Sequence, residues 1–167
     1  MARRLHFEVV PLSEIQSTNI SVGRRTVLVV DDEPLVADTL AMILSQAGFE
    51  AMSAYNAQAA LHAARDRAPG FLLTDVQMPG TDGIELAMQV ADEFPACAIL
   101  LFSGHATGAD LERARRAGYE FQLMEKPIHP EHLVRYITNS FEGERGARDG
   151  SVLAGASLWE TMRNRAS

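Results

Sequence analysis

The sequence predicts an α/β fold in which five strands form a parallel sheet with helices on both faces. Short apolar runs of strand length alternate along the chain with longer segments of helical periodicity. Glycine or proline separates most of these segments, as expected for the connections between them. Five strand–helix units in series favour a parallel, doubly wound sheet, because each crossover helix returns the chain to the same end of the sheet.

The composition is that of an ordinary globular domain, with 167 residues, 47% hydrophobic and 22% charged. The net charge of −7 disfavours non-specific binding to nucleic acid or anionic lipid. A single cysteine, Cys97, excludes an internal disulfide and suits a reducing cytoplasm. No apolar stretch approaches the roughly 18 residues of a membrane span. We therefore expect a cytoplasmic protein with no nucleic-acid partner and no membrane partner.

The first two units are predicted from residue 26 onward. Residues 26–30 form a continuous apolar and β-branched run, which is typical of a central strand buried on both faces. A helix is predicted between Pro34, which suits a first helical turn, and Gly48, which suits the residue after a helix. A second strand at 49–54 and an alanine-rich helix at 56–67 complete this half.

The third unit starts with a buried strand at 71–74, and a turn over 78–83 leads to a helix at about 84–94. This helix is predicted to stop before Pro95, because proline disfavours helical backbone in the residue that precedes it. The fourth strand is predicted at 98–102 from another continuous apolar run.

The last two helices are predicted from their flanking residues. An arginine-rich helix at about 109–117 would end at Gly118, and a fifth strand follows at 121–124. Pro130 is placed to open a final helix that reaches about residue 141.

The chain is divided into one domain with two flanks. Residues 1–25 are interpreted as an N-terminal extension with a short strand near 7–10, and residues 26–142 as the domain. Residues 143–167 are rich in glycine, serine and alanine and are predicted to be a flexible tail with a helix near 157–163.

Polar side chains are predicted at the carboxyl ends of four strands. Asp31 and Asp32 follow the first strand, and Asp75 follows the third. Ser103 follows the fourth strand, and Lys126, the only lysine in the sequence, follows the fifth. Ligands of doubly wound sheets bind outside these ends. Three carboxylates, one hydroxyl and one ammonium group therefore converge on one rim of the predicted sheet.

These residue types suit phosphoryl transfer to a carboxylate. Crowded carboxylates repel one another, and a hard cation such as Mg²⁺ relieves the repulsion and also binds phosphate oxygens. A carboxylate can act as the nucleophile and form an aspartyl-phosphate. The transfer depends mainly on positioning and on neutralising the charge of the phosphoryl oxygens, which a metal, a hydroxyl and an ammonium group provide.

Four separated runs carry these residues, namely Val29–Pro34, Asp75–Gly83, Phe102–Gly104 and Lys126–Pro127. Together they resemble the motifs of bacterial two-component response-regulator receiver domains of the chemotaxis-regulator type. The resemblance covers about residues 26–141. It implies a flavodoxin-like sheet with the strand order 2-1-3-4-5.

The resemblance also implies a role for each residue of the rim. Asp75 would accept a phosphoryl group from a sensor histidine kinase or a histidine phosphotransfer protein. Ser103 and Lys126 would bind phosphoryl oxygens. The implied ligands of Mg²⁺ (or Mn²⁺) are the side chains of Asp32 and Asp75, Asp31 largely through water, and the backbone carbonyl of Gln77.

Further residues are implied to support the site. Met78, Pro79 and Gly83 would hold the loop after Asp75, and Pro127 would follow a peptide bond that is often cis in the family.

Three positions depart from the family pattern. Ser103 replaces the commoner threonine and keeps its hydroxyl. Leu123 stands three residues before Lys126, where the family has a rotating tyrosine or phenylalanine, so Phe121 is the candidate aromatic switch. Gly70 replaces a residue that is usually polar, and we interpret this change as incidental.

The sequence therefore predicts a stand-alone receiver, since the 25 residues after Glu142 are too few for an effector domain. Its output would be altered binding to an unidentified downstream protein, with a homodimer allowed, and it would catalyse only its own phosphorylation and dephosphorylation.

One alternative is a pseudo-receiver, an interaction module that is not regulated by phosphorylation. Two other classes are disfavoured. A haloacid-dehalogenase-like phosphatase would carry its nucleophilic aspartate after the first strand, and a flavodoxin would need a phosphate-binding loop where Asp31–Glu33 repel phosphate.

Overall fold

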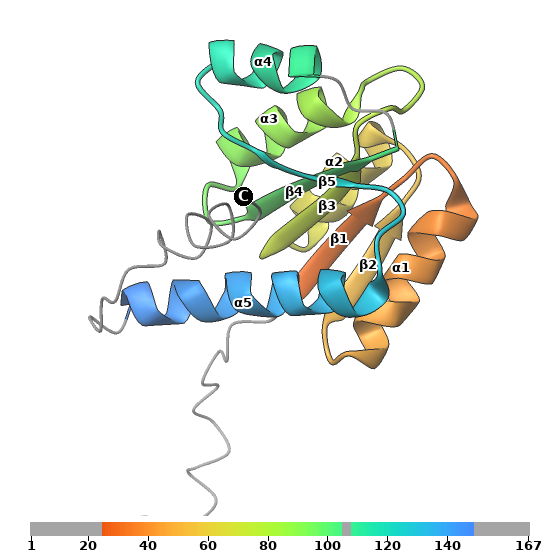
Figure 1. Cartoon of the computed structure of the whole chain (residues 1–167), viewed down its shortest axis with the longest axis vertical. Helices are drawn as coiled ribbons and strands as arrows, with labels where there is room; N and C mark the ends of the chain where they lie inside the picture. The colour runs from red at the N-terminus through yellow and green to blue at the C-terminus, as the bar shows by residue number, and fades with distance from the viewer. Residues whose placement is uncertain (1–24, 105–107, 149–167) are drawn as a thin grey trace, which may run out of the picture.

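The computed structural model describes residues 25–104 and 108–148 (Figure 1). In these residues, five strands pair in parallel in the order β2-β1-β3-β4-β5, which confirms the predicted fold class and strand order. The elements are β1 (Thr26–Val30), α1 (Pro34–Gln46), β2 (Glu50–Ala54), α2 (Ala57–Asp66), β3 (Phe71–Asp75), α3 (Gly83–Glu93), β4 (Ala98–Ser103), α4 (Gly108–Arg116), β5 (Gln122–Glu125) and α5 (Pro130–Arg148).

Helices cover both faces of the sheet. Figure 1 shows α1 and α5 on one face and α2, α3 and α4 on the other. Alternate residues of β1 therefore enter different clusters: Val27 and Val29 pack with α1 and α5, whereas Leu28 and Val30 pack with α2 and α3. All five residues of β1 and of β3 are buried, as the continuous apolar runs predict.

The helix termini follow from local residues. Pro34 occupies the first turn of α1, where its missing N–H leaves no hydrogen bond unmade. Gly48 after the same helix has φ 91°, a conformation that suits glycine. The side chains of Asn56 and Asp82 cap α2 and α3 by accepting hydrogen bonds from backbone N–H groups.

Two predicted boundaries are wrong. The fifth strand begins at Gln122, so Phe121 precedes it. Helix α5 continues to Arg148 instead of ending near residue 141, so residues 143–148 are helical where a flexible tail was predicted. Neither Gly143 nor Gly146 ends the helix, because each internal glycine costs only about 1 kcal/mol relative to alanine.

Phe141 anchors α5 at the amino end of the sheet. Its ring lies 5.9 Å from the ring of Phe49 and 6.3 Å from that of Phe71, measured between centroids. A Cβ atom at Gly70 would lie only 2.7 Å from Cε1 of Phe141. The glycine at position 70 therefore makes room for the aromatic ring, and interpreting it as incidental was wrong.

Several sequence-based expectations lie outside the described residues, namely the predicted strand near 7–10, the predicted helix near 157–163 and the flexibility of residues 149–167. Within residues 25–104 and 108–148, we find no helix with both the length and the apolar character that crossing a bilayer requires. The cytoplasmic location stays a prediction.

Candidate functional site

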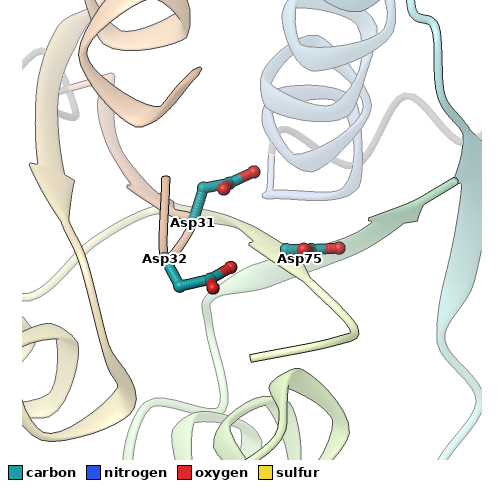
Figure 2. Close-up of side chains that lie close together, drawn as sticks. All are labelled: Asp31, Asp32 and Asp75. Atoms are coloured by element: carbon teal, nitrogen blue, oxygen red, sulfur yellow. The ribbon is translucent and has the colours of Figure 1, made fainter. Parts of the chain in front are cut away.

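The carboxyl end of the sheet brings four predicted site residues together. Asp31 directly follows β1, Asp75 is the last residue of β3, and Lys126 directly follows β5. One carboxylate oxygen from each of Asp31, Asp32 and Asp75 lies within 4.8 Å of the others. Figure 2 shows the three carboxylates directed to the same side. The Lys126 Nζ atom lies 2.9 Å from Oδ2 of Asp31 and 3.4 Å from Oδ2 of Asp75.

The three acids differ in depth. Asp31 is 1% exposed and Asp75 is 7% exposed, whereas Asp32 is exposed at the rim. A buried carboxylate needs partners to offset the loss of hydration. Asp31 obtains them from Lys126 and from the backbone N–H of Glu33, which donates to Oδ1 at 2.9 Å.

The electrostatics of Asp75 reflect opposing effects. Burial raises the pKa of the Asp75 carboxyl above its ordinary value, and the charge of Asp31 acts in the same direction. Lys126 and a hydrogen bond with the backbone of Gln77 lower this pKa without reversing the shift. Burial also acts to lower the pKa of Lys126, but its contacts with Asp31 and Asp75 outweigh burial and raise that pKa. The pocket therefore holds a charged lysine against two close carboxyl groups.

The donor set of the pocket suits a hard divalent cation. Asp31, Asp32 and Asp75 offer only oxygen atoms, which Mg²⁺ and Mn²⁺ prefer, and no nitrogen or sulfur that would favour zinc. Among the described residues, no other group of three histidine, cysteine, aspartate or glutamate side chains is arranged for a metal ion.

Ser103 and Lys126 are held on neighbouring strand ends. Ser103 is the last residue of β4 and is 1% exposed. Its backbone oxygen accepts a hydrogen bond from the Lys126 N–H at 2.9 Å. The Lys126 Nζ atom also lies 4.3 Å from the centre of the Phe102 ring, close enough for a cation–π interaction. These contacts fix where the lysine enters the pocket.

The loop after Asp75 is tightly closed. The N–H of Gly83 donates to the backbone oxygen of Val76 at 3.0 Å. Any Cβ atom at Gly83 would overlap the backbone oxygen of Asp75, so this position requires glycine. Met78 is buried below the loop, whereas Pro79 is exposed.

The structure bears on two loop features that the resemblance implies, a cis peptide bond and a backbone metal ligand. The Lys126-Pro127 peptide bond is cis, as the resemblance implies. The role of the Gln77 carbonyl as a metal ligand stays a prediction, since the interaction found is between the Gln77 backbone and the Asp75 carboxyl.

Position 123, where the family has a rotating aromatic residue, is a leucine, and the aromatic residues near β5 lie before the strand. Phe121 stacks on Tyr119 with ring centroids 5.6 Å apart, and the Tyr119 hydroxyl donates to Oδ1 of Asp92 at 2.6 Å. Leu123 is partly buried against the cluster that contains Ile84. The role of Phe121 as a switch stays a prediction. Sequence reasoning missed the link from Tyr119 to Asp92, because 27 residues separate the two.

Comparison with known proteins gives one matching family and several curated relatives. Residues 27–138 match the family described as "Response regulator receiver domain". The nitrogen assimilation regulatory protein NtrX of Azorhizobium caulinodans is 31% identical over 144 residues, which cover 84% of this chain and 31% of NtrX. The transcriptional regulatory protein FixJ of Bradyrhizobium diazoefficiens is 31% identical over 127 residues, which cover 75% of this chain and 62% of FixJ.

The fold has a close structural counterpart. A solved receiver domain protein (CheY-like) from Methanospirillum hungatei JF-1 superposes with a TM-score of 0.68 at 23% identity, covering 74% of this chain and 98% of that one. The chain thus spans 31% and 62% of the two curated relatives but nearly all of the solved domain. Because FixJ is named as a transcriptional regulator, the expectation of no nucleic-acid partner stays a prediction.

Proposed function

Because the chain belongs to the response regulator receiver domain family, we propose that Asp75 accepts a phosphoryl group in a reaction that depends on Mg²⁺ (or Mn²⁺). The observation that carries this function is the convergence of Asp31, Asp32, Asp75 and Lys126 in one pocket. Asp75 is the nucleophile, since it ends β3 beside both the lysine and the other two acids.

The transfer moves a phosphoryl group from a phosphohistidine of a sensor kinase or phosphotransfer protein to Asp75. A carboxylate oxygen of Asp75 forms a bond to phosphorus while the phosphorus–nitrogen bond breaks, and the imidazole retains the electron pair and takes up a proton. Asp32, Asp75 and the Gln77 carbonyl, with Asp31 largely through water, would hold Mg²⁺, which would supply positive charge to the phosphoryl oxygens. Lys126 pairs with one phosphoryl oxygen, and the hydroxyl of Ser103 donates to another.

The output is a change in protein–protein binding. Receiver domains interact with histidine kinases and with downstream effectors, and we infer that phosphorylated Asp75 alters the affinity of this domain for an effector or for a second copy of itself. We infer no catalytic activity beyond the phosphorylation and dephosphorylation of Asp75. The complete pocket argues against a pseudo-receiver, which has no need of a lysine placed between two buried carboxyl groups.

Incubation with acetyl phosphate and Mg²⁺ tests the phosphoacceptor. Mass spectrometry is expected to find one phosphoryl adduct on the wild type, and none on Asp75→Asn. Asp66→Asn is the matched control, because Asp66 is exposed at the end of α2 and lies outside the pocket. An unlabelled wild type that also fails to bind beryllofluoride would favour the pseudo-receiver, and an equal adduct on Asp75→Asn would exclude Asp75 as the acceptor.

A further inference from the structure

An ion pair connects the loop after Asp75 to helix α4. Asp82 caps α3, because its Oδ1 atom accepts a hydrogen bond from the N–H of Glu85 at 2.9 Å. Its other oxygen, Oδ2, lies 2.5 Å from a guanidinium nitrogen of Arg113 on α4. One carboxylate therefore fixes the start of α3 and binds the neighbouring helix at the same time.

Asp82 is also closely tied to the phosphoacceptor. The next residue, Gly83, packs so closely on the backbone oxygen of Asp75 that no side chain fits there. The hydrogen bond from Gly83 to Val76 closes the loop, so the backbone of Asp75 and of the residue that follows it is in contact with the start of α3. A displacement of the Asp75 backbone therefore moves Asp82.

Arg113 differs from a neighbouring arginine on the same helix. Arg116 pairs with Glu112 one turn away, so its ion pair stays within α4. Arg113 instead reaches a residue 31 positions earlier in the chain. Figure 1 shows α4 next to α3, and Ala114 of α4 packs in one buried cluster with Ile84 of α3.

The opposite end of α3 holds the segment that follows α4. Asp92, in the last turn of α3, accepts a hydrogen bond from the hydroxyl of Tyr119 at 2.6 Å. The Tyr119 ring stacks on Phe121 immediately before β5. Polar contacts thus join α3 to the α4–β5 region at both ends of the helix.

We propose that the Asp82–Arg113 ion pair transmits the change at Asp75 to α4. This inference rests on the proposed function of Asp75. The carboxylate belongs to the residue just before Gly83, which packs on the backbone of the phosphoacceptor, and its ion pair is a direct polar contact to α4. The Tyr119–Asp92 link holds the far end of the α4–β5 segment, so a shift of Asp82 reorients α4 and leaves that end in place.

The two partners can be tested without unfolding the protein. Asp82→Asn keeps an oxygen that caps α3 but removes the charge that binds Arg113. Arg113→Gln removes the cation, and both side chains are partly exposed, with relative exposures of 33% and 51%. Exposed ion pairs contribute little to global stability, so both variants are expected to fold. Arg116→Gln is the matched control, because it loses an ion pair inside α4 only.

Hydrogen exchange of the α4 backbone amides, with and without beryllofluoride and Mg²⁺, measures the response. In the wild type and in Arg116→Gln, beryllofluoride is expected to change the exchange rates of the amides in Gly108–Arg116 by about fivefold or more, the lower end of typical coupling between sites. In Asp82→Asn and Arg113→Gln, this response is expected to vanish although beryllofluoride still binds.

The affinity for beryllofluoride distinguishes loss of the Asp82–Arg113 contact from a change in net charge alone. The two variants remove charges of opposite sign, so charge alone would shift the affinity in opposite directions. If both variants remove one shared link, they shift the affinity for beryllofluoride in the same direction. The double variant is then expected to have the same affinity as either single variant. Opposite shifts, or a normal α4 response in either variant, would overturn the proposed link.

The same measurements distinguish failure of the link from failure of the proposed function. A wild type that does not bind beryllofluoride contradicts the function of Asp75. A wild type that binds it without any change in α4 contradicts only the ion-pair link.

Discussion

The two ends of the sheet are built from opposite kinds of contact. At the carboxyl end, Asp31 and Asp75 are buried next to Lys126, and their geometry places like charges close together. At the amino end, Phe141 packs against Phe49 and Phe71, and the guanidinium of Arg25, 5.9 Å from the centre of the Phe49 ring, is partly exposed. Buried charges are costly unless they are paired, whereas aromatic packing is favourable without further partners.

The same strands therefore carry the reactive groups at one end and the contacts that stabilise the fold at the other. The first residues of β3 support an aromatic cluster, and its last residue is a buried carboxyl group whose pKa is raised by burial. The amino end is therefore expected to hold the fold in any condition. The carboxyl end is expected to gain or lose stability with the ions and groups that it binds.

Lys126→Met gives the largest expected effect, because it leaves Asp31 buried without its cation. Removing one partner of a buried ion pair costs about 3 kcal/mol in free energy of unfolding. Urea denaturation in chelator measures the loss, and Mg²⁺ is expected to recover part of it by neutralising the same carboxylates. Arg135→Met, at an exposed position on α5, is the control. A loss that Mg²⁺ does not alter would contradict the dependence of this end on ions.

Mg²⁺ itself is expected to stabilise the wild type. At a concentration about 100 times its dissociation constant, the gain in unfolding free energy is about 2.7 kcal/mol, because the ion binds the folded pocket only. Asp32→Asn removes the exposed ligand and is expected to lose most of this gain, while Asp66→Asn keeps it. Thermal unfolding at increasing Mg²⁺ measures the effect, and an unchanged wild-type melting temperature would count against the metal pocket.

Phe141→Ala and Gly70→Ala test how much the aromatic contacts at the amino end of the sheet contribute to the free energy of unfolding. Truncating the partly buried ring is expected to cost about 2 kcal/mol, below the range for fully buried aromatic residues. Gly70→Ala forces the ring to shift and is expected to cost about 1 kcal/mol. In the Phe141→Ala background, Gly70→Ala is expected to cost almost nothing, because the ring is gone. Urea denaturation of all four proteins measures this coupling, and additive losses would show that the two residues do not interact.

The smallest effect is expected at the ion pair between Arg67 and Glu50, which also lies near the amino end. Both side chains are more than 40% exposed, at 45% and 42%. Arg67→Gln is therefore expected to lower the unfolding free energy by less than about 1 kcal/mol, with a smaller loss at high salt. A loss above about 2 kcal/mol would indicate that charges stabilise this end as strongly as the aromatic cluster does.

The pocket could be predicted because its determinants are local. Strands β1, β3 and β4 are largely continuous apolar runs, and the site residues of these strands come at or just after the end of the run, as Asp75 does after Phe71–Thr74. Parallel strands then bring these ends together without any knowledge of side-chain contacts. The strand order and the roles of Ser103 and Lys126 came from the resemblance to a family and not from the pattern itself.

Contacts between distant residues could not be predicted in this way. Nothing near Gly70 in the sequence indicates that Phe141 lies above it. The pairing of Asp82 with Arg113 likewise depends on how α4 packs against α3. The end of α5 was predicted too early for a different reason: residues 143–167 are rich in glycine, serine and alanine, although the glutamate, arginine and alanine among residues 142–148 favour helix.

The position of Lys126 has a practical consequence for labelling chemistry. It is the only lysine among the 167 residues, and 27% of its side chain is exposed. An amine-reactive reagent therefore finds its single side-chain target inside the acidic pocket. The nucleophile is the neutral amine, and the raised pKa of Lys126 makes that form scarce near neutral pH. Its acylation rate reports directly on how the pocket is filled, without any engineered probe.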